Sequence, residues 1–418
     1  MEKQKCPEVR FNSFTKDWEQ SYFLDNIQNI IDYRGRTPKK LGMDWSKSGY
    51  LALSALNVKN GYIDPRIDAH YGDEKLYQKW MSGNELRKGQ VLFTTEAPMG
   101  NVAQVPDDTG YILSQRTIAF NTEKNKISDN FLAVLLGSPN VFNRLSELCS
   151  GGTAKGVSQK SLSTLEVIFP TELNEQECIG NFFQNLDKSI ALQEKKLSQT
   201  QNLKKAMLEK MFPKVGSKQP EIRLKGFSGD WDTIRLGSLC SIGDIDHRMP
   251  ESTKSGIPYL MTGDFFGING LDFENAKLIS NEDYEQLSKK IKPEIGDILF
   301  ARYASVGTVR LVVTDVKFLI SYSCAILKTS VNSKGEYLFY WFQNSFAQNQ
   351  IEQEINTGSQ RNIGIDSLKK LSVILPKTNE QKAIAYFFKS LDETLALQQQ
   401  QLQTLKNLKQ SFLEKMFV

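Results

Sequence analysis

Residues 174–212 read NEQECIGNFFQNLDKSIALQEKKLSQTQNLKKAMLEKMF, and residues 379–417 read NEQKAIAYFFKSLDETLALQQQQLQTLKNLKQSFLEKMF. The two stretches align without a gap, and 20 of the 39 aligned positions are identical. Apolar residues recur in both at steps of three, four and seven, which is the period of one face of an α-helix. A helix of this length would extend about 58 Å, and its single apolar stripe needs a partner along that length. The sequence therefore predicts two long helices that pair with each other.

The two copies can associate around a pseudo-twofold axis, as the subunits of a homodimer do. An axis lying across the helices makes them antiparallel, and we expect a coiled-coil contact between their apolar stripes. The alternative is that each helix packs back on its own domain, which would need more apolar surface than one stripe supplies. The residues expected to pair are Leu186, Ile190, Leu197, Leu203 and Met207 in the first helix and Leu391, Leu395, Leu402, Leu405 and Phe412 in the second.

The repeat extends over the rest of the chain. PEVRF at residues 7–11 reappears as PEIRL at 220–224, and GQVLF at 89–93 reappears as GDILF at 296–300. Each copy begins with a domain in which frequent glycines separate short predicted strands, and a long helix follows. We predict an α+β fold with an internal pseudo-twofold repeat. Its parts are two globular domains, at 1–170 and 214–376, joined by antiparallel helices at 171–213 and 377–418.

Shorter segments carry signals of their own. Val91–Phe93 and Ile298–Phe300 are apolar and follow glycine, which predicts buried strands. Asn174 with Glu177 three residues later predicts an N-cap and a capping box for the first long helix. We also expect a strand at Thr308–Val313 and helices at Asp129–Leu148 and Glu336–Ile355.

Composition limits the possible functions. The 418 residues include 52 Lys and Arg against 48 Asp and Glu, a net charge of +4, without the strong basic excess that many nucleic-acid binders show. The five cysteines form no C-x-x-C pair, so a zinc ribbon is not expected, and the odd number fits a reducing compartment. No apolar run approaches the ~20 residues of a membrane span, and no signal-like stretch follows Met1. We expect a cytoplasmic protein with no metal site and no membrane association.

Catalytic motifs are absent from the sequence. It contains no P-loop, no G-x-G-x-x-G and no G-x-S-x-G elbow. The Asn-Pro-Pro or Asp-Pro-Pro loop with a following aromatic, which amino-methyltransferases use, is also missing. Acidic-x-Lys triplets of the nuclease type occur at 73–75 and 315–317, but they do not align between the copies. We therefore predict no catalytic residues, and a binding and assembly function.

Two loops carry the residues best suited to contact DNA. YRGRTPKK at 33–40 holds four cations and no acid, and its Arg36 recurs as Arg248 in the second copy. The loop at 150–157, paired with 356–363, combines glycine, hydroxyl and cation, which suits phosphate contacts, while Gln, Arg and Asn can also read base edges. Solvated turns are the alternative. The expected DNA contacts are Arg34, Arg36, Lys39, Lys40, Arg116, Thr153 and Lys155 in the first copy and Arg248, Arg302, Gln360, Arg361 and Asn362 in the second.

The order of these parts resembles the specificity subunit of a type I restriction–modification enzyme. The resemblance rests on the Arg-Gly-x-Thr-Pro-like loop at Arg34–Lys39, the Gly-Asp-Ile-Leu-Phe segment at Gly296–Phe300 and the Thr-Gly-Ser segment at Thr357–Ser359. Helices that open with Asn-Glu-Gln, at Asn174 and again at Asn379, complete the repeated unit. The second basic loop departs from the pattern, with Asp246-His247 in place of Arg-Gly and Met249-Pro250 in place of Thr-Pro.

The resemblance implies a mechanism without catalysis in this chain. Each globular domain would read one half of a bipartite, asymmetric sequence in double-stranded DNA, and the helical pair would set the spacer and help to dock two modification subunits. Those methyltransferase subunits would bring S-adenosylmethionine, and restriction subunits would bring ATP and Mg²⁺, so no cofactor is expected here. The alternatives are the recognition part of a fused nuclease–methyltransferase and a coiled-coil scaffold that does not bind DNA.

Overall fold

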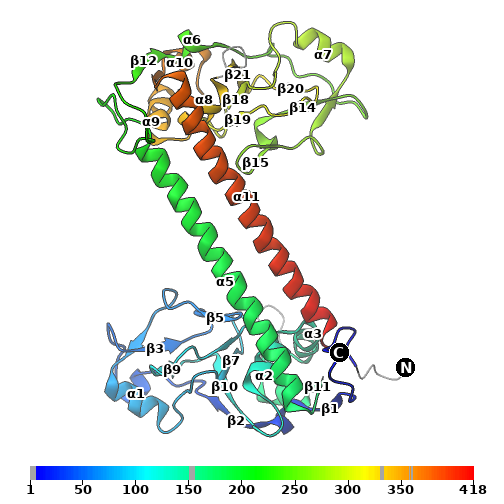
Figure 1. The fold of residues 1–418 in the computed structure, drawn as a ribbon. Helices are drawn as coiled ribbons and strands as arrows, with labels where there is room; N and C mark the ends of the chain where they lie inside the picture. Colours follow the sequence, from blue (N-terminus) through cyan, green and yellow to red (C-terminus); the bar gives the residue numbers. More distant parts are fainter. Residues whose placement is uncertain (1–5, 150–155, 330–333, 357, 359–360) are drawn as a thin grey trace. The chain divides into compact units, whose positions relative to one another are not determined.

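The computed structural model describes residues 6–149, 156–329, 334–356, 358 and 361–418. The chain divides into two compact units, of which the first consists of two separate segments of the sequence (Figure 1). Unit 1 combines residues 1–194 with 400–418, and unit 2 is residues 195–399. Each unit therefore contains one globular part, called head 1 (described residues 6–172) or head 2 (described residues 213–377), and a portion of both long helices.

Head 1 is built from short strands and helices. Its strands are β1 (Glu19–Tyr22), β2 (Ile27–Asp32), β3 (Tyr50–Leu53), β4 (Val58–Lys59), β5 (Tyr62–Ile63), β6 (Tyr71–Gly72), β7 (Val91–Thr94), β8 (Val102–Gln104), β9 (Tyr111–Leu113), β10 (Thr117–Thr122) and β11 (Glu166–Phe169). Its helices are α1 (Glu74–Met81), α2 (Asp129–Gly137), α3 (Pro139–Leu148) and α4 (Gln159–Thr164), with 3₁₀ turns η1 (Phe23–Asn26) and η2 (Lys39–Leu41).

Head 2 repeats this inventory. Its strands are β12 (Asp232–Arg235), β13 (Ser241–Gly243), β14 (Ile257–Leu260), β15 (Phe265–Phe266), β16 (Gly270–Leu271), β17 (Lys277–Ile279), β18 (Ile298–Ala301), β19 (Val309–Leu311), β20 (Leu319–Ile320), β21 (Cys324–Lys328) and β22 (Ser372–Leu375). Its helices are α6 (Leu236–Leu239), α7 (Asn281–Leu287), α8 (Gly335–Trp341), α9 (Ser345–Glu354) and α10 (Ile365–Lys370), with the 3₁₀ turn η3 (Thr262–Asp264).

The sheets of the two heads have the same topology. The antiparallel sheet β2-β10-β7-β8 in head 1 matches β13-β21-β18-β19 in head 2. The mixed sheet β6-β3-β9 matches β17-β14-β20, and each contains one parallel pair. The pairs β1-β11 and β4-β5 match β12-β22 and β15-β16. The α+β fold and the internal repeat are thus confirmed, strand by strand.

The central strand of each head lies between two apolar cores. In β7, Val91 and Phe93 face the core that α2 and α5 share, while Leu92 faces the core that contains β3, β9 and α1. In β18, Ile298 and Phe300 face one core and Leu299 faces another. Since successive side chains of a strand point to opposite faces, burial on both sides requires a continuous apolar run. The two strands predicted from that run are confirmed.

Helix is confirmed at 129–148 and at 336–355, although each stretch contains two helices. The stretch 129–148 is divided into α2 and α3, because Pro139 cannot continue the hydrogen-bond ladder and instead starts a new helix. The helix expected at 336–355 is likewise split into α8 and α9, where Asn344 caps the second through a hydrogen bond from the Ala347 N–H. The strand expected at 308–313 is limited to β19.

The long helices are α5 (Leu173–Lys210) and α11 (Thr378–Lys415), each of 38 residues. The predicted N-cap was wrong: α5 begins one residue before Asn174, so Asn174 lies in its first turn. The neighbouring Glu175 has a structural role that the capping pattern does not suggest. Its buried carboxylate accepts hydrogen bonds from Arg10 Nε (2.6 Å), Arg10 Nη2 (2.8 Å) and Trp18 Nε1 (3.2 Å).

An equivalent pair of arginine and buried glutamate occurs at the start of α11. There Glu380 accepts two hydrogen bonds from Arg223, at 2.8 Å each. The glutamine that follows each glutamate also makes the same contact in both copies: Gln176 donates to Pro170 O and Gln381 donates to Pro376 O. The duplicated Asn-Glu-Gln motif and the duplicated arginine upstream therefore attach each long helix to the head before it.

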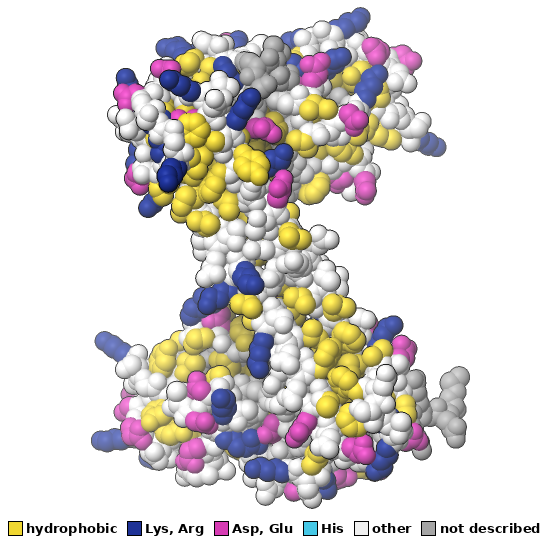
Figure 2. All heavy atoms as spheres, viewed as in Figure 1, with side chains coloured by type: hydrophobic (Ala, Val, Ile, Leu, Met, Phe, Trp, Pro, Cys, Tyr) yellow, Lys and Arg dark blue, Asp and Glu magenta, His cyan; other side chains and the backbone are white. Residues whose placement is uncertain are grey.

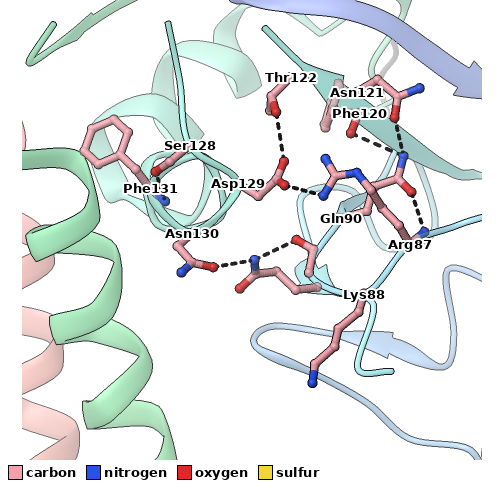
Figure 3. Close-up of polar contacts among 12 residues, drawn as sticks. Arg87, Lys88, Gln90, Phe120, Asn121, Thr122, Ser128, Asp129, Asn130 and Phe131 are labelled. Atoms are coloured by element: carbon pink, nitrogen blue, oxygen red, sulfur yellow. Dashed lines mark hydrogen bonds and ion pairs between the residues drawn. The ribbon is translucent and has the colours of Figure 1, made fainter. Parts of the chain in front are cut away.

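A second polar network joins α5 to head 1. Figure 3 shows Asp129, at the start of α2, between Arg87 (2.5 Å) and Thr122 (3.0 Å). The adjacent Asn130 side-chain oxygen accepts hydrogen bonds from Gln104 of β8 (3.0 Å) and from Gln184 of α5 (2.7 Å). These contacts set the direction in which α5 leaves the head.

Within each unit the two long helices pack against each other in antiparallel fashion. In unit 1, Asp187 of α5 pairs with Lys409 of α11 at 2.5 Å. In unit 2, farther along α5, Lys204 pairs with Asp392 at 2.5 Å. The residue numbers rise on one helix as they fall on the other, so the predicted antiparallel pairing is confirmed.

One of the predicted pairing residues is wrong. Leu203 is 45% exposed, whereas the other nine are buried or partly buried. The six-residue step from Leu197 to Leu203 rotates the side chain by about 120° away from the stripe. Thr200 and the buried Lys204 continue the stripe at steps of three and four instead.

The C-terminal ends of the helices complete the opposite heads. Phe212, after α5, stacks on Phe388 and contacts Tyr337 in unit 2. Phe417, after α11, packs among Trp18 and Phe131 in the core of head 1. The repeated Leu-Glu-Lys-Met-Phe sequence is thus a core element of each unit.

Candidate nucleic-acid interface

In head 1 the loops predicted to contact DNA meet at one edge of the four-stranded sheet. Antiparallel pairing places the end of β2, the end of β7 and the start of β10 at this edge, because Ile118 pairs with Asp32 and Thr117 with Thr94. Residues after the 150–155 segment join them, since the Val157 N–H donates to Thr95 O at 2.8 Å. The strand register thus brings together loops that are far apart in sequence.

The four cations of the first basic loop differ in their surroundings. Arg34 forms an ion pair with Asp32 at 2.9 Å. Lys40 donates from Nζ to Gly35 O at 2.6 Å, which closes the loop on itself. Lys39 is exposed in η2, and within the described residues its ammonium group has no ion-pair partner. Lys39 is therefore the cation of this loop most open to an incoming phosphate.

Arg36 holds the loop to the rest of the head. Its guanidinium lies 4.3 Å from the centre of the Tyr33 ring and donates to Trp80 O at the end of α1. Its own carbonyl accepts a hydrogen bond from Gln115 Nε2 at 2.6 Å. Burial raises the pKa of Tyr33, so its phenol stays protonated at neutral pH, and the Arg36 contact is to the face of a neutral ring.

Arg116 projects from a turn that has a left-handed backbone conformation, with φ of 65°. Its side chain is 55% exposed and pairs with Glu96 at 3.0 Å. The Arg116 carbonyl accepts from the Thr95 N–H at 2.8 Å, which connects the turn to the end of β7. This exposed cation therefore lies beside the convergent loops, and its contact with DNA stays a prediction.

Arg248, the repeat of Arg36, makes an equivalent attachment in head 2. It pairs with Asp283 at 2.6 Å and donates to Gln286 at 3.1 Å, and both residues belong to α7. The helix α7 occupies the place in head 2 that α1 occupies in head 1. The duplicated arginine therefore ties its loop to the same helix in both heads.

The structure does not support Arg302 as an exposed DNA contact. It is 6% exposed, and its guanidinium bonds to the Asp244 carboxylate and, at 3.0 Å, to Ile363 O. Lys290 and His247 also approach Asp244, at 3.1 Å each. Burial opposes ionisation of Asp244, but these hydrogen bonds and the charge of Arg302 outweigh it and lower the pKa of the carboxyl group.

Asp32 and Asp244 are the residues of the interface that sequence reasoning missed. Asp32 is the last residue of β2 and Asp244 follows β13. Each binds an arginine: Arg34 from its own loop in head 1, and Arg302, just after β18, in head 2. Their signal was present in the sequence, since the two aspartates align in the repeat.

The remaining predicted contacts lie in the second loop. Arg361 is exposed and pairs with Glu352 on α9. Asn362 accepts a hydrogen bond at its carbonyl from the Asn356 N–H at 2.8 Å and forms a bridge with Tyr303. Thr153, Lys155 and Gln360 lie outside the described residues.

The two interfaces differ in charge. Residues 33–40 of head 1 include four cations and no acid, whereas the aligned residues 245–252 of head 2 include Arg248 with Asp246 and Glu251. On the face that Figure 2 shows, Lys and Arg are interspersed with Asp and Glu on each head rather than gathered into one basic patch.

The described residues contain no group of three or more His, Cys, Asp or Glu side chains placed to hold a metal ion. Among the described helices, none has both the length and the apolar character needed to cross a bilayer.

Sequence comparison identifies relatives over nearly the whole chain. The model of the type I restriction modification DNA specificity domain matches residues 15–202 and again residues 228–407. The MjaX specificity subunit of Methanocaldococcus jannaschii is 23% identical over 413 residues, which cover 95% of this chain and 92% of that protein. The type I restriction enzyme MjaVIII specificity subunit of the same organism is 21% identical over 409 residues, covering 95% and 91%.

Solved structures share the fold. The S subunit of a type I restriction–modification system from M. genitalium superposes with a TM-score of 0.63 at 16% identity, covering 99% of both chains. A chain from a structural study of assembly and conformational transition in the type I system gives a TM-score of 0.54 at 18% identity, covering 96% of this chain and 97% of that one. With the specificity domain matched once in each copy of the repeat, this protein belongs to the type I restriction–modification DNA specificity family.

Proposed function

We propose that this chain is the specificity subunit of a type I restriction–modification complex and directs it to one bipartite DNA sequence. The observation that carries the proposal is the duplication itself: two heads with the same sheet order, each with a loop cluster at the same sheet edge, and each matched by the specificity domain. Each head reads one half of the target. The chain supplies no reaction of its own, and S-adenosylmethionine, ATP and Mg²⁺ act in the partner subunits.

The differences between the heads support an asymmetric target. Arg34 and Lys39 in the first basic loop correspond to Asp246 and Glu251 in the second, by the alignment that pairs Arg36 with Arg248. Base edges and phosphates are recognised by the chemical type of the side chain, so loops that differ this much select different sequences. A scaffold that does not bind DNA would have no need for this divergence.

The long helices suit the role of a spacer. Each extends about 57 Å, more than the ~34–36 Å between major-groove segments one turn apart on a duplex. Their pairing is fixed by the ion pairs of Lys204 with Asp392 and of Lys409 with Asp187, which are the same pair repeated. We infer that the helices set the number of unread base pairs between the half-sites.

Exposed leucines on the helices support docking of two identical modification subunits. Leu192 and its repeat Leu397 are each 54% exposed, and Leu203 and its repeat Leu408 are 45% and 43% exposed. Leucines exposed at equivalent positions of a repeat offer the same apolar contact twice. One modification subunit per copy matches this arrangement.

The proposal is tested by replacing residues 7–170 with the first domain of another specificity subunit and sequencing the methylated sites in cells that express the modification subunit. The expected result is a new sequence in one half of the motif, with the other half unchanged. As a second arm, one helical turn is inserted into both α5 and α11, which should lengthen the spacer. Methylation by the purified chain alone would favour a fused enzyme. A methylation motif that is unchanged in both halves after the exchange would contradict the proposal.

A further inference from the structure

Unit 2 contains a cavity of about 520 Å³ that is lined by basic side chains and by no acidic ones. Its walls come from the start of β19, the turn of the β15–β16 hairpin, the end of α8 and one side of α5 and α11. The cations that line it are Lys204, Lys205 and Arg310, and no Asp or Glu is among the lining residues. The volume is within the range of small-molecule sites and larger than a single inorganic ion requires.

The two lysines contribute differently. Lys204 is largely buried and forms its 2.5 Å ion pair with Asp392, so its charge is already neutralised. Lys205 is exposed, and within the described residues no carboxylate pairs with it. Lys205 therefore adds a positive charge at the cavity that the protein does not balance.

Arg310 adds a second one. It is 6% exposed, and its donors are met only by neutral carbonyl oxygens: Nε by Gly270 O (3.1 Å), Nη1 by Val309 O (2.7 Å) and Nη2 by Gly267 O (3.1 Å) and Phe266 O (3.3 Å). Burial lowers the pKa of Arg310, but an arginine remains charged at neutral pH. A buried charge without a counter-ion is costly, and an anionic ligand would relieve that cost.

The fold does not require this arginine. β8 pairs with β7 as β19 pairs with β18, and the residue of head 1 at the position of Arg310 is Ala103. The repeat of Lys205 is Gln410. The ion pair of Lys406 with Glu194 in unit 1 corresponds to the uncharged Gln201 and Gln399 in unit 2. Among the residues that line the cavity, unit 2 thus has the cations Arg310 and Lys205 where the repeat has Ala103 and Gln410.

We propose that this cavity binds a phosphate group, held by the Arg310 guanidinium and the Lys205 ammonium, with the Thr308 hydroxyl on its wall. Guanidinium and ammonium groups are the side chains that proteins use to bind phosphate. The group belongs either to a DNA backbone that reaches unit 2 or to a free nucleotide. The first source rests on the proposed function, and the second is independent of it.

The test uses the full chain and two probes, adenosine 5′-monophosphate and duplex DNA. The variant Arg310→Ala/Lys205→Gln installs the residues of the other copy, and Lys406→Gln in unit 1 is the matched control. Titration calorimetry should show nucleotide binding to the wild type and to the control, weakened at least tenfold in the double variant. Thermal unfolding without ligand checks that the variant is folded, which we expect because an unbalanced buried charge has been removed.

The DNA arm uses the chain assembled with modification subunits. If a backbone phosphate occupies the cavity, the slope of log affinity against log salt falls by about 0.9 in the double variant, since one neutralised phosphate contributes about 0.9. An unchanged slope with weakened nucleotide binding assigns the cavity to a free phosphate compound. Equal nucleotide affinity and equal slopes in wild type and variant overturn the inference. Tight DNA binding by the wild-type complex would still stand as support for the proposed function.

Discussion

Replacement of Glu175 by leucine should loosen the attachment of α5 to head 1 more than the same change at Glu380 loosens α11 from head 2. The Glu175 side chain is 1% exposed and that of its partner Arg10 is 13% exposed. Removing one member of such a buried ion pair costs about 3–5 kcal/mol, because the other charge is left unpaired. The same cost applies to Glu380, whose side chain is 3% exposed and whose partner Arg223 is 16% exposed.

The difference between the heads comes from the tryptophans. Trp18 donates its indole N–H to Glu175, whereas the equivalent Trp231 Nε1 has no hydrogen-bond partner among the described residues. Glu175→Leu therefore also loses a hydrogen bond to a charged group, which is worth about 1.5–3 kcal/mol. We expect the Glu175 variant to be destabilised by that additional amount relative to the Glu380 variant.

Hydrogen exchange with mass spectrometry measures both sites in one sample, since peptides from 173–183 and 378–388 report the opening free energies of the two helix starts. The double variant Arg10→Met/Glu175→Leu should recover part of the loss, because it removes the unpaired guanidinium. An effect of Glu380→Leu equal to or larger than that of Glu175→Leu would refute the account of the indole. A loss below about 1 kcal/mol at both sites would refute the role of the buried ion pair.

Three further predictions concern the helix pair, pH and DNA. Lys204→Met should lower the free energy of unfolding of unit 2, measured in urea, by about 3–5 kcal/mol, because Asp392 is left largely buried without its lysine. The control Lys406→Met removes a half-exposed ion pair and should change the free energy of unfolding of unit 1 by less than about 1 kcal/mol. Equal effects of the two variants would contradict this prediction. The pKa of Asp244 is lowered in the folded protein, so its stabilising contribution is present above about pH 4 and is lost as the pH falls through the folded value. Urea unfolding between pH 3 and 7 should therefore show a weaker pH dependence for Asp244→Asn than for the wild type, and an identical profile would speak against it. Lys39→Ala should weaken DNA binding of the assembled complex at all sequences and reduce the salt slope by about 0.9, and a change confined to one sequence would instead indicate a base contact.

Much of the fold followed from comparing the chain with itself. The alignment of 174–212 with 379–417 predicted the long helices and their antiparallel pairing, because a sustained apolar stripe leaves few other ways to be buried. Leu203 was assigned to the apolar stripe because leucine is apolar. The helical period instead places Lys204, four residues after Thr200, at the buried position. Local breaks such as the one at Pro139 depend on a single residue inside an otherwise periodic pattern.

The site was predictable as a set of loops but not residue by residue. Repetition and charge indicated the loops, and the strand register brings the described ones together. The roles of Arg36 and Arg302 depend on Trp80 O and Asp244, which lie 44 and 58 residues away in the chain. No local sequence pattern indicates such a distant partner. An arginine that holds a loop in place therefore cannot be distinguished, from sequence alone, from an exposed arginine that contacts DNA.

The exchange of helix ends between the units has a consequence for synthesis. Unit 2 is one continuous segment, 195–399, so the ribosome has delivered all of it before the last turns of α11 are made. Head 1 emerges before unit 2, yet its core lacks Met416 and Phe417 until the end of α11 has been made. Because domains fold cotranslationally as units and long-range contacts form slowly, the half made first is the half completed last. During that interval the apolar site around Trp18 is a target for chaperones, and a chain that stops before residue 416 would retain a closed unit 2 beside an unfinished head 1.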